Sequence, residues 1–455
     1  LGADDVGFEC DLTAPGVSGV DLLDVDDTGI SNQDDITRHT TPDFDVFLPG
    51  GGPLSVMEGW LAEAGDALVW YMEGTGDSAI HILSQDDIDA VISVLRSDFL
   101  TQGPQVPAFE AAVAAHTGAA YAVAVNSATS ALHIACLALG VGTGDVVWTV
   151  PTTFVASANC ALYCGASVDF VDIDPIRYTM CPKALEAKLK TASQLPKVII
   201  PVHLCGQSAD MKAISKIARN YGISIIEDAS HAIGATYEGK PIGDCRYSEI
   251  TVFSFHPVKI ITTAEGGLAT TQNQKIAEAM DLARSHGITR NPELYEGPSQ
   301  GSWYYEQITL GFNYRMTELQ AALGLTQMQR LTEIVDRRAA IAARYDQMLA
   351  DLPVQRPIQA GSTGSSWHLY VIQVPEIHHS KIFDDLRRAG IGVNLHYIPI
   401  HRHPYYRRMG FKLGQFPNAE AYYRKSISIP LYFGLTEKDQ DRVCDTIEQS
   451  FFKTT

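Results

Sequence analysis

Short runs of β-branched residues alternate with amphipathic segments between residues 120 and 349, and this alternation constrains the fold most strongly. The β-branched runs lie at 120–126, 145–150, 197–203, 223–229 and 249–255, and the helical segments at 129–139, 211–222 and 317–349. Parallel strands need a crossover helix between them, because the chain must return to the starting edge of the sheet. The sequence therefore predicts an α/β domain with a mostly parallel central sheet and flanking helices.

The pattern changes on both sides of this region. A helix is expected at 84–97, where Ser84 supplies an N-cap and acidic residues fill the first turn. After residue 350, short apolar runs and a final helix near 436–452 indicate a smaller α+β unit. We predict three parts: a β-rich acidic segment at 1–77, a large α/β domain at 78–330 and a small C-terminal α+β domain at 331–455.

Charge is distributed very unevenly along the chain. Residues 1–80 contain 17 Asp and Glu but only one basic residue, Arg38, whereas the whole chain has a formal charge of −19. Neither part is basic, so the sequence argues against binding to nucleic acid or to anionic membranes. Residues 117–144 are almost uncharged, but Asn126 and several glycines interrupt them, which favours a buried segment of a soluble protein over a membrane span.

The eight cysteines are scattered, form no CxxC pair and lie mostly in apolar runs. This usage favours reduced thiols in a cytoplasmic protein over disulfides or a metal site. The chain begins at Leu1 without a signal peptide, as expected of a fragment or a processed product.

The acidic N-terminal segment has a resemblance of its own. The stretch DTGISNQDDIT…TTPDF within residues 21–50 resembles the opening of bacterial Ig-like surface repeats. Its carboxylates form either a calcium site or, as we favour, a solvated acidic turn; they are Asp24, Asp26, Asp27, Asp34 and Asp35.

Polar or ionisable residues follow three of the expected strands. Ligands of such sheets bind at the carboxyl ends of strands. The strand ending at Val125 runs into Asn-Ser-Ala-Thr-Ser and a helix, which suits either a phosphate or an ordinary N-cap. Asp228 ends another strand and is either a functional acid or one arm of a structural salt bridge. Lys259 follows a third strand and lies among apolar residues. It is either an ordinary surface charge or a desolvated lysine that acts as a nucleophile.

Pyridoxal 5′-phosphate (PLP) requires all three of these elements, namely a phosphate anchor, a carboxylate for the pyridinium nitrogen and a Schiff-base lysine. The region 84–452 resembles the fold-type I, PLP-dependent sugar aminotransferases of the DegT/DnrJ/EryC/StrS family, especially the pseudaminic acid branch. The strings that carry the resemblance include NSATSALH (126–133), EDASHAIGATYEGKPIG (227–243), SFHPVKIITTAEGG (254–267) and HYIPIH (396–401).

The resemblance implies a role for each matched residue. Lys259 corresponds to the Schiff-base lysine, which also moves protons, and Asp228 to the partner of the pyridinium nitrogen. Phe154 matches the aromatic residue that stacks on the ring, and His231 lies where a Gln or His approaches the ring oxygen. The phosphate contacts correspond to Ala128, Thr129 and Ser254, and to Asn313 from the neighbouring subunit of a homodimer. The sugar-nucleotide contacts correspond to Leu100, Thr101, Gln102, Gly103, His396, Tyr397, Ile398 and Pro399.

The implied reaction moves an amino group from L-glutamate to the 4-keto carbon of a UDP-linked 4-keto-6-deoxy-HexNAc sugar, without a metal ion. The retained Lys259 argues against the family's dehydratases, in which histidine replaces this lysine. The alternative is a non-catalytic PLP-binding sensor or a surface-tethered binding module, with the Ig-like segment as its functional part. Deleting residues 1–78 separates the two, since an enzyme keeps its activity and a binding module loses binding.

The chain departs from the family pattern at three places. Ile260 and Ala264 replace the Pro or His and the Gly that are expected in "HPVKxITTGEGG". Ala264 adds a Cβ where the chain is expected to need a positive φ, which strains the backbone. The usual Tyr-Gly-(Arg/Lys)-Gln opening is replaced by GTGDSAIHIL at 74–83, at one edge of the expected substrate pocket.

Overall fold

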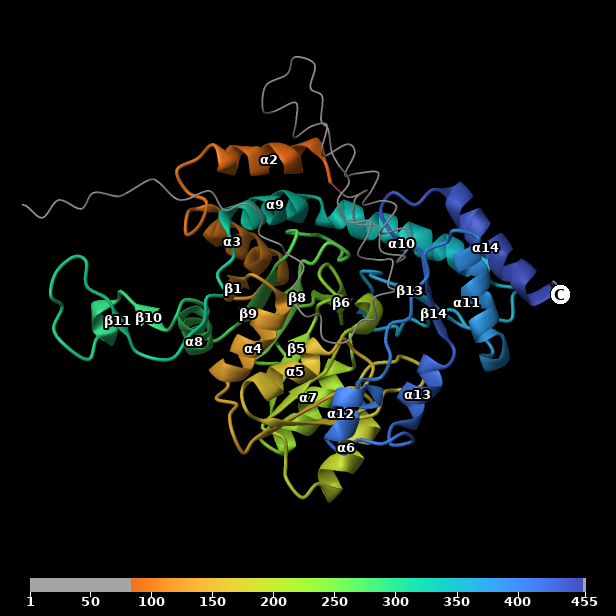
Figure 1. Ribbon diagram of the computed structural model, residues 1–455, viewed down its shortest axis with the longest axis horizontal. Coiled ribbons are helices and arrows are strands. Elements are labelled where there is room, and N and C mark those ends of the chain that lie inside the picture. The colour runs from red at the N-terminus through yellow and green to blue at the C-terminus, as the bar shows by residue number, and fades with distance from the viewer. Residues whose placement is uncertain (1–82, 453–455) are drawn as a thin grey trace, which may run out of the picture. The chain divides into compact units, whose positions relative to one another are not determined.

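The computed structural model describes residues 83–452 of the chain (Figure 1). The Ig-like resemblance, its aspartate cluster and residues 74–82 lie outside the described residues. Ser84 caps the first described helix, α2 (Gln85–Leu95), with a capping box, and α3 (Gln105–Thr117) follows it.

The central feature is a seven-stranded mixed sheet in the order β1-β9-β8-β5-β4-β2-β3. The five strands expected from the β-branched runs are confirmed as β1 (Tyr121–Val125), β2 (Val146–Thr149), β4 (Val198–Ile200), β5 (Ser224–Asp228) and β8 (Ile250–Ser254). The sequence did not indicate β3 (Ser167–Phe170) or β9 (Gly267–Thr271). Strand β9 runs antiparallel to both of its neighbours, β1 and β8, and the other pairs in the sheet are parallel.

Helices connect and flank these strands (Figure 1). They are α4 (Ala128–Ala138), α5 (Ala156–Tyr163), α6 (Pro182–Thr191), α7 (Met211–Asn220), α8 (Gln274–Arg284), α9 (Glu318–Gln329) and α10 (Leu331–Met348). The helical stretch expected over 317–349 is confirmed as two consecutive helices, since Arg330 ends α9 and begins α10 with φ −100° and ψ 2°. Two-residue strands β10 (Ile288–Thr289) and β11 (Glu306–Gln307) form a hairpin that extends away from the central sheet.

The elements beyond α10 are β13 (Tyr370–Gln373), α11 (His379–Arg388), α12 (Pro404–Arg408), α13 (Pro417–Tyr423), β14 (Ser426–Ile429) and α14 (Glu437–Phe452). A second hydrophobic core forms among α10, β13, α11, β14 and α14, whereas α12 and α13 pack on the core of the central sheet. Strands β13 and β14 pair antiparallel, and α11 packs on α14. Side chains such as Tyr345, Tyr370 and Ile447 pack in this cluster, separately from the larger cluster around the central sheet.

Small elements complete the described chain. Strands β6 (Thr236–Tyr237), β7 (Lys240–Pro241) and β12 (Thr363–Gly364) form a separate sheet, and η3 (Leu204–Gly206) follows β4. The remaining short helices are η4 (Pro292–Leu294), η5 (Glu376–His378) and η6 (Ile400–Arg402). Within residues 83–452 all seven cysteines are free, and none of the helices has the length and hydropathy needed to cross a bilayer.

Candidate active site

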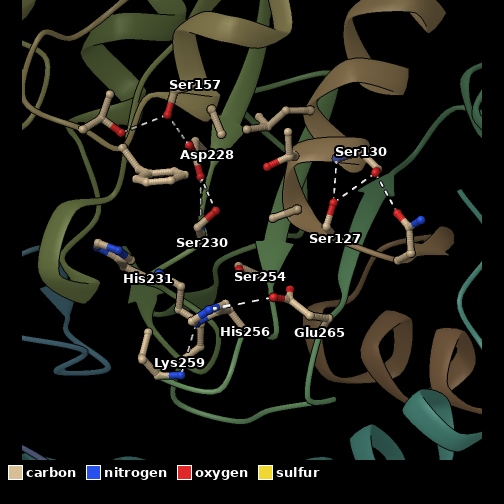
Figure 2. Close-up of a pocket in the computed structure, with 18 of the residues that line it drawn as sticks. Ser127, Ser130, Ser157, Asp228, Ser230, His231, Ser254, His256, Lys259 and Glu265 are labelled. Carbon is tan, nitrogen blue, oxygen red and sulfur yellow. Dashed lines mark hydrogen bonds and ion pairs between the residues drawn. The ribbon is translucent and has the colours of Figure 1, made fainter. Parts of the chain in front are cut away.

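A cavity of about 800 Å³ lies where β5 and β8 end and α4 begins. It is lined by nine of the residues that the sequence singled out: Ala128, Thr129, Phe154, Asp228, His231, Ser254, Lys259, His396 and Tyr397. Figure 2 shows the polar side chains of this cavity converging from the two strand ends and the helix.

The N-terminus of α4 forms one wall of the cavity. Ser127 caps the helix and accepts a hydrogen bond from the Ser130 N–H at 3.1 Å, and the Ser130 hydroxyl donates to Asn126 Oδ1 at 2.7 Å. The first N–H groups of a helix precede its internal hydrogen bonds and attract anions. Strand β9 passes close behind, since a Cβ on Gly267 would lie 2.4 Å from the Ala128 nitrogen. This wall fits a phosphate group.

The Asp228 carboxylate lies at the end of β5 and is 4% exposed. Its Oδ2 accepts the Ser157 hydroxyl at 2.6 Å, and its Oδ1 accepts both the hydroxyl and the N–H of Ser230 at 2.6 and 3.1 Å. Charge-assisted hydrogen bonds of this kind satisfy and orient a buried carboxylate. The acid is therefore fixed in position and fits a protonated ring nitrogen.

Lys259 reaches the cavity from the turn that follows β8. The turn is closed by hydrogen bonds, including Lys259 N–H to the His256 carbonyl at 2.9 Å and Ala264 N–H to the Thr262 hydroxyl at 3.0 Å. Ala264 has φ 63°, so the expected positive φ at this position is confirmed. The neighbouring pair His256 and Glu265, with Nε2 and Oε1 3.9 Å apart, also lines the cavity (Figure 2).

Two buried histidines of the cavity, His231 and His396, are uncharged. Burial, together with Lys259 and His396, holds the pKa of His231 well below its usual range. Burial, followed by the charge of Lys259, lowers the pKa of His396 to about 3. Both rings are neutral at physiological pH, so the cavity does not add imidazolium charges to the lysine.

Phe154 stands out because 57% of its surface is exposed although it lies next to the cavity. Its ring centroid is 6.2 Å from that of Tyr397. A large aromatic ring that is exposed beside a cavity offers a face on which a flat ligand can stack. The residue thus fits an aromatic cofactor ring better than it fits a place in the protein core.

The remaining sequence-predicted residues do not line this cavity. One group is the turn formed by Leu100, Thr101, Gln102 and Gly103, in which Thr101 forms a β-bridge with Thr317. The other group is Ile398 and Pro399, which follow Tyr397 in the chain. A Cβ on Gly103 would lie 2.7 Å from the Glu318 carboxylate, which accepts N–H groups from the start of α3. The glycine is thus explained by close packing in this turn.

Asn313 is exposed and also lies outside the cavity lining. Its carbonyl accepts a hydrogen bond from the Asn126 side chain at 3.5 Å, so its backbone lies at the edge of the cavity. This position leaves its side chain available to a neighbouring molecule.

Sequence reasoning missed several polar residues of the cavity. Ser157 contacts Asp228 from α5, 71 positions away, and nothing in the local sequence marks it. Ser230 could have been found, because a serine two residues after an aspartate often closes a turn on its carboxylate. His256 and Glu265 lie in the string that was matched, but no role was assigned to them.

The fold and this cavity together define a PLP-dependent fold-type I aminotransferase. The chain belongs to the DegT/DnrJ/EryC1/StrS aminotransferase family, whose sequence model matches residues 81–448. Family membership supports the enzyme over the non-catalytic alternative.

Individual relatives agree with this assignment. The chain is 39% identical over 376 residues to the spore coat polysaccharide biosynthesis protein SpsC of Bacillus subtilis, covering 81% of this chain and 95% of SpsC. It is similar to the structure of Helicobacter pylori PseC, an aminotransferase involved in the biosynthesis of pseudoaminic acid, with TM-score 0.75, 31% identity and coverage of 81% and 97%. A Streptococcus pneumoniae protein assigned as a sugar aminotransferase matches in its PLP form with TM-score 0.74, 30% identity and coverage of 81% and 96%.

Replacing Ala264 by glycine is expected to stabilise the protein. Glycine adopts φ 63° without the Cβ clash that strains alanine, so the free energy of unfolding should rise by up to about 1 kcal/mol. Urea denaturation measures the change. As a matched control, Ala192→Gly changes a residue with φ −67° and should lower stability by about 0.4–1 kcal/mol. Equal effects of the two substitutions would show that Ala264 is not strained.

The neutral histidines make stability depend on pH. An unfolded histidine takes up a proton as pH falls below about 6.5, whereas folded His396 does so only near pH 3, so stability declines as pH falls through this interval. In His396→Gln, the dependence of unfolding free energy on pH should be shallower by up to about 1.4 kcal/mol per pH unit. Urea denaturation between pH 6.5 and 4.5 measures both slopes, and identical slopes would contradict the burial of a neutral His396.

Proposed function

We propose that this protein transfers an amino group from L-glutamate to the 4-keto carbon of a UDP-linked 4-keto-6-deoxy-HexNAc sugar, in the biosynthesis of pseudaminic acid or a related amino sugar. The observation that carries the proposal is that Lys259, Asp228 and the N-terminus of α4 line one cavity. The 31% identity to PseC, a protein named for pseudoaminic acid biosynthesis, supports this class of substrate.

Different residues of the cavity would bind different parts of the cofactor. PLP, when bound, supplies an electron sink for the carbon that carries the amine. Asp228 would bind the ring nitrogen and hold a proton on it, and Phe154 would stack on the ring. The N–H groups of Ala128 and Thr129, with the Ser254 hydroxyl, would bind the phosphate.

Lys259 would supply the amine that bonds to the cofactor and would then move the proton at the reacting carbon. A lysine can act as a base only in its neutral form. His231 and His396 are uncharged, and they line the same cavity as Glu265 and His256. The same amine would serve both half-reactions, first with glutamate and then with the ketosugar.

A second copy of the chain would complete the site. We assign Asn313 to the phosphate of the neighbouring subunit's cofactor in a homodimer, since it is exposed at the cavity edge. The turn at 100–103 and the segment 396–399 would contact the sugar nucleotide, with His396 and Tyr397 at the cavity itself. The seven free cysteines of residues 83–452 suit the reducing cytoplasm, where we place the reaction.

An absorbance scan before and after addition of L-glutamate tests cofactor, lysine and donor together. The purified protein is expected to absorb at about 410–430 nm and to shift toward about 330 nm with glutamate. Lys259→Ala should lose both the long-wavelength band and turnover. Lys240→Ala, which changes an exposed lysine on β7, should keep both.

Amination of the sugar is the second arm of this experiment. Mass spectrometry should detect a 4-amino product when the glutamate-treated protein receives the UDP-linked 4-ketosugar. Normal turnover in Lys259→Ala would refute the assigned lysine, and a glutamate shift without sugar amination would refute the assigned acceptor.

A further inference from the structure

Cys205, which follows β4 in η3, adopts a backbone conformation that is unusual for a residue with a side chain. Its φ is 61° and its ψ is 9°, in the left-handed region. Non-glycine residues in this region are strained and persist only where the surroundings impose the conformation. The Cys205 carbonyl accepts N–H groups from His368 and Leu369 at 3.1 and 3.4 Å, and a Cβ on adjacent Gly206 would lie 2.8 Å from the Trp367 nitrogen.

This conformation directs the Cys205 N–H to His231 Nδ1 at 3.3 Å. A main-chain N–H can only donate, so Nδ1 must be the acceptor and carries no hydrogen. Burial and the charges of Lys259 and His396 keep His231 neutral, and the His368 ring, whose centroid is 4.2 Å away, is kept neutral in the same way. The single ring hydrogen of His231 is therefore on Nε2.

The Nε2–H of His231 in turn lies 3.1 Å from the Tyr397 oxygen. Because Nε2 donates here, Tyr397 accepts from the histidine and must direct its own hydroxyl hydrogen elsewhere. Both side chains line the active-site cavity. One main-chain N–H outside the cavity thus sets the direction of two hydrogen-bond donors inside it.

We propose that Cys205 is a positioning residue whose main-chain N–H fixes His231 as a hydrogen-bond donor at Nε2, and through it the orientation of the Tyr397 hydroxyl. This deepens the proposed function and rests on it, since Tyr397, which accepts from His231, would direct its own hydroxyl hydrogen to an oxygen atom of the cofactor or the sugar nucleotide. With the other tautomer of His231, the Tyr397 hydroxyl would donate to the bare Nε2, and its hydrogen would be lost to those oxygens. The thiol of Cys205 has no part in this role.

Two substitutions distinguish the role of the Cys205 main chain from that of its side chain. Cys205→Gly keeps the N–H and favours the left-handed conformation, so this conservative variant should retain kcat within about twofold. Cys205→Val keeps an apolar side chain, but a β-branched residue resists φ 61°, so kcat should fall by about tenfold or more with little change in KM for glutamate. A loss in Cys205→Gly equal to that in Cys205→Val would overturn the proposal.

The tautomer itself is measured by ¹⁵N chemical shifts of labelled histidine, with and without PLP. Wild type and Cys205→Gly should show an unprotonated Nδ1 and a protonated Nε2 at His231, and Cys205→Val should show a mixture. A proton on Nδ1 in the wild type would refute the proposal whatever the activity. Because this readout needs no sugar substrate, it stands even where the proposed acceptor is wrong.

His231 variants cover the case in which Cys205→Val does not fold. The amide of His231→Gln can accept from Cys205 and donate to Tyr397, whereas His231→Leu can do neither. We expect His231→Gln to keep at least about tenfold more kcat than His231→Leu, with both retaining the absorbance of bound cofactor. Equal activity of these two variants would overturn the proposal.

Discussion

The site depends first on one buried carboxylate, that of Asp228. A charged group with 4% exposure is tolerated only when hydrogen bonds replace its water, and here Ser157 and Ser230 satisfy both oxygens. Its backbone is held equally firmly, with Asp228 N–H bonded to the Pro201 carbonyl and its own carbonyl accepting from His203. The adjacent Glu227 is fixed by His203 and Ser248 at 2.7 and 2.6 Å, so the whole end of β5 is rigid.

Around Asp228, the active site combines hydrogen-bond donors in fixed positions with buried histidines that carry no charge. The three neutral histidines His231, His368 and His396 lie near Lys259 without contributing positive charge. The rings of His231 and His396 also make hydrogen bonds, to Tyr397 and Ser428. Positive φ angles occur at Cys205, whose N–H donates to His231, and at Ala264, which precedes the cavity-lining Glu265. In both cases a side-chain-bearing residue is held in a conformation that glycine would adopt more easily, as is common where a backbone group must be aimed.

Much of this arrangement could be predicted from the sequence, because β-branched runs mark buried parallel strands and motif strings mark the turns that follow them. Asp228, Lys259 and the start of α4 were found in this way, and the positive φ of Ala264 followed from the glycine expected there. Strand β9 was missed because its sequence, Gly-Leu-Ala-Thr-Thr, has β-branched residues only at its last two positions and its pairing is set by distant partners. Ser157 was missed for the same reason, since its contact with Asp228 exists only in the folded chain. The role proposed for Asn313 involves a second copy of the chain and rests on the family resemblance and on the exposure of this residue.

Strand β9 also has a consequence for synthesis on the ribosome. Strand β1 lies at the edge of the sheet and pairs with β9, about 140 residues later in the chain. At roughly 5–20 residues per second, the interval between the two strands is roughly 7–30 s. During that time the start of α4 lacks the backbone at Gly267 that packs behind it. This wall of the cavity therefore forms late in translation, after β9 has emerged from the ribosome.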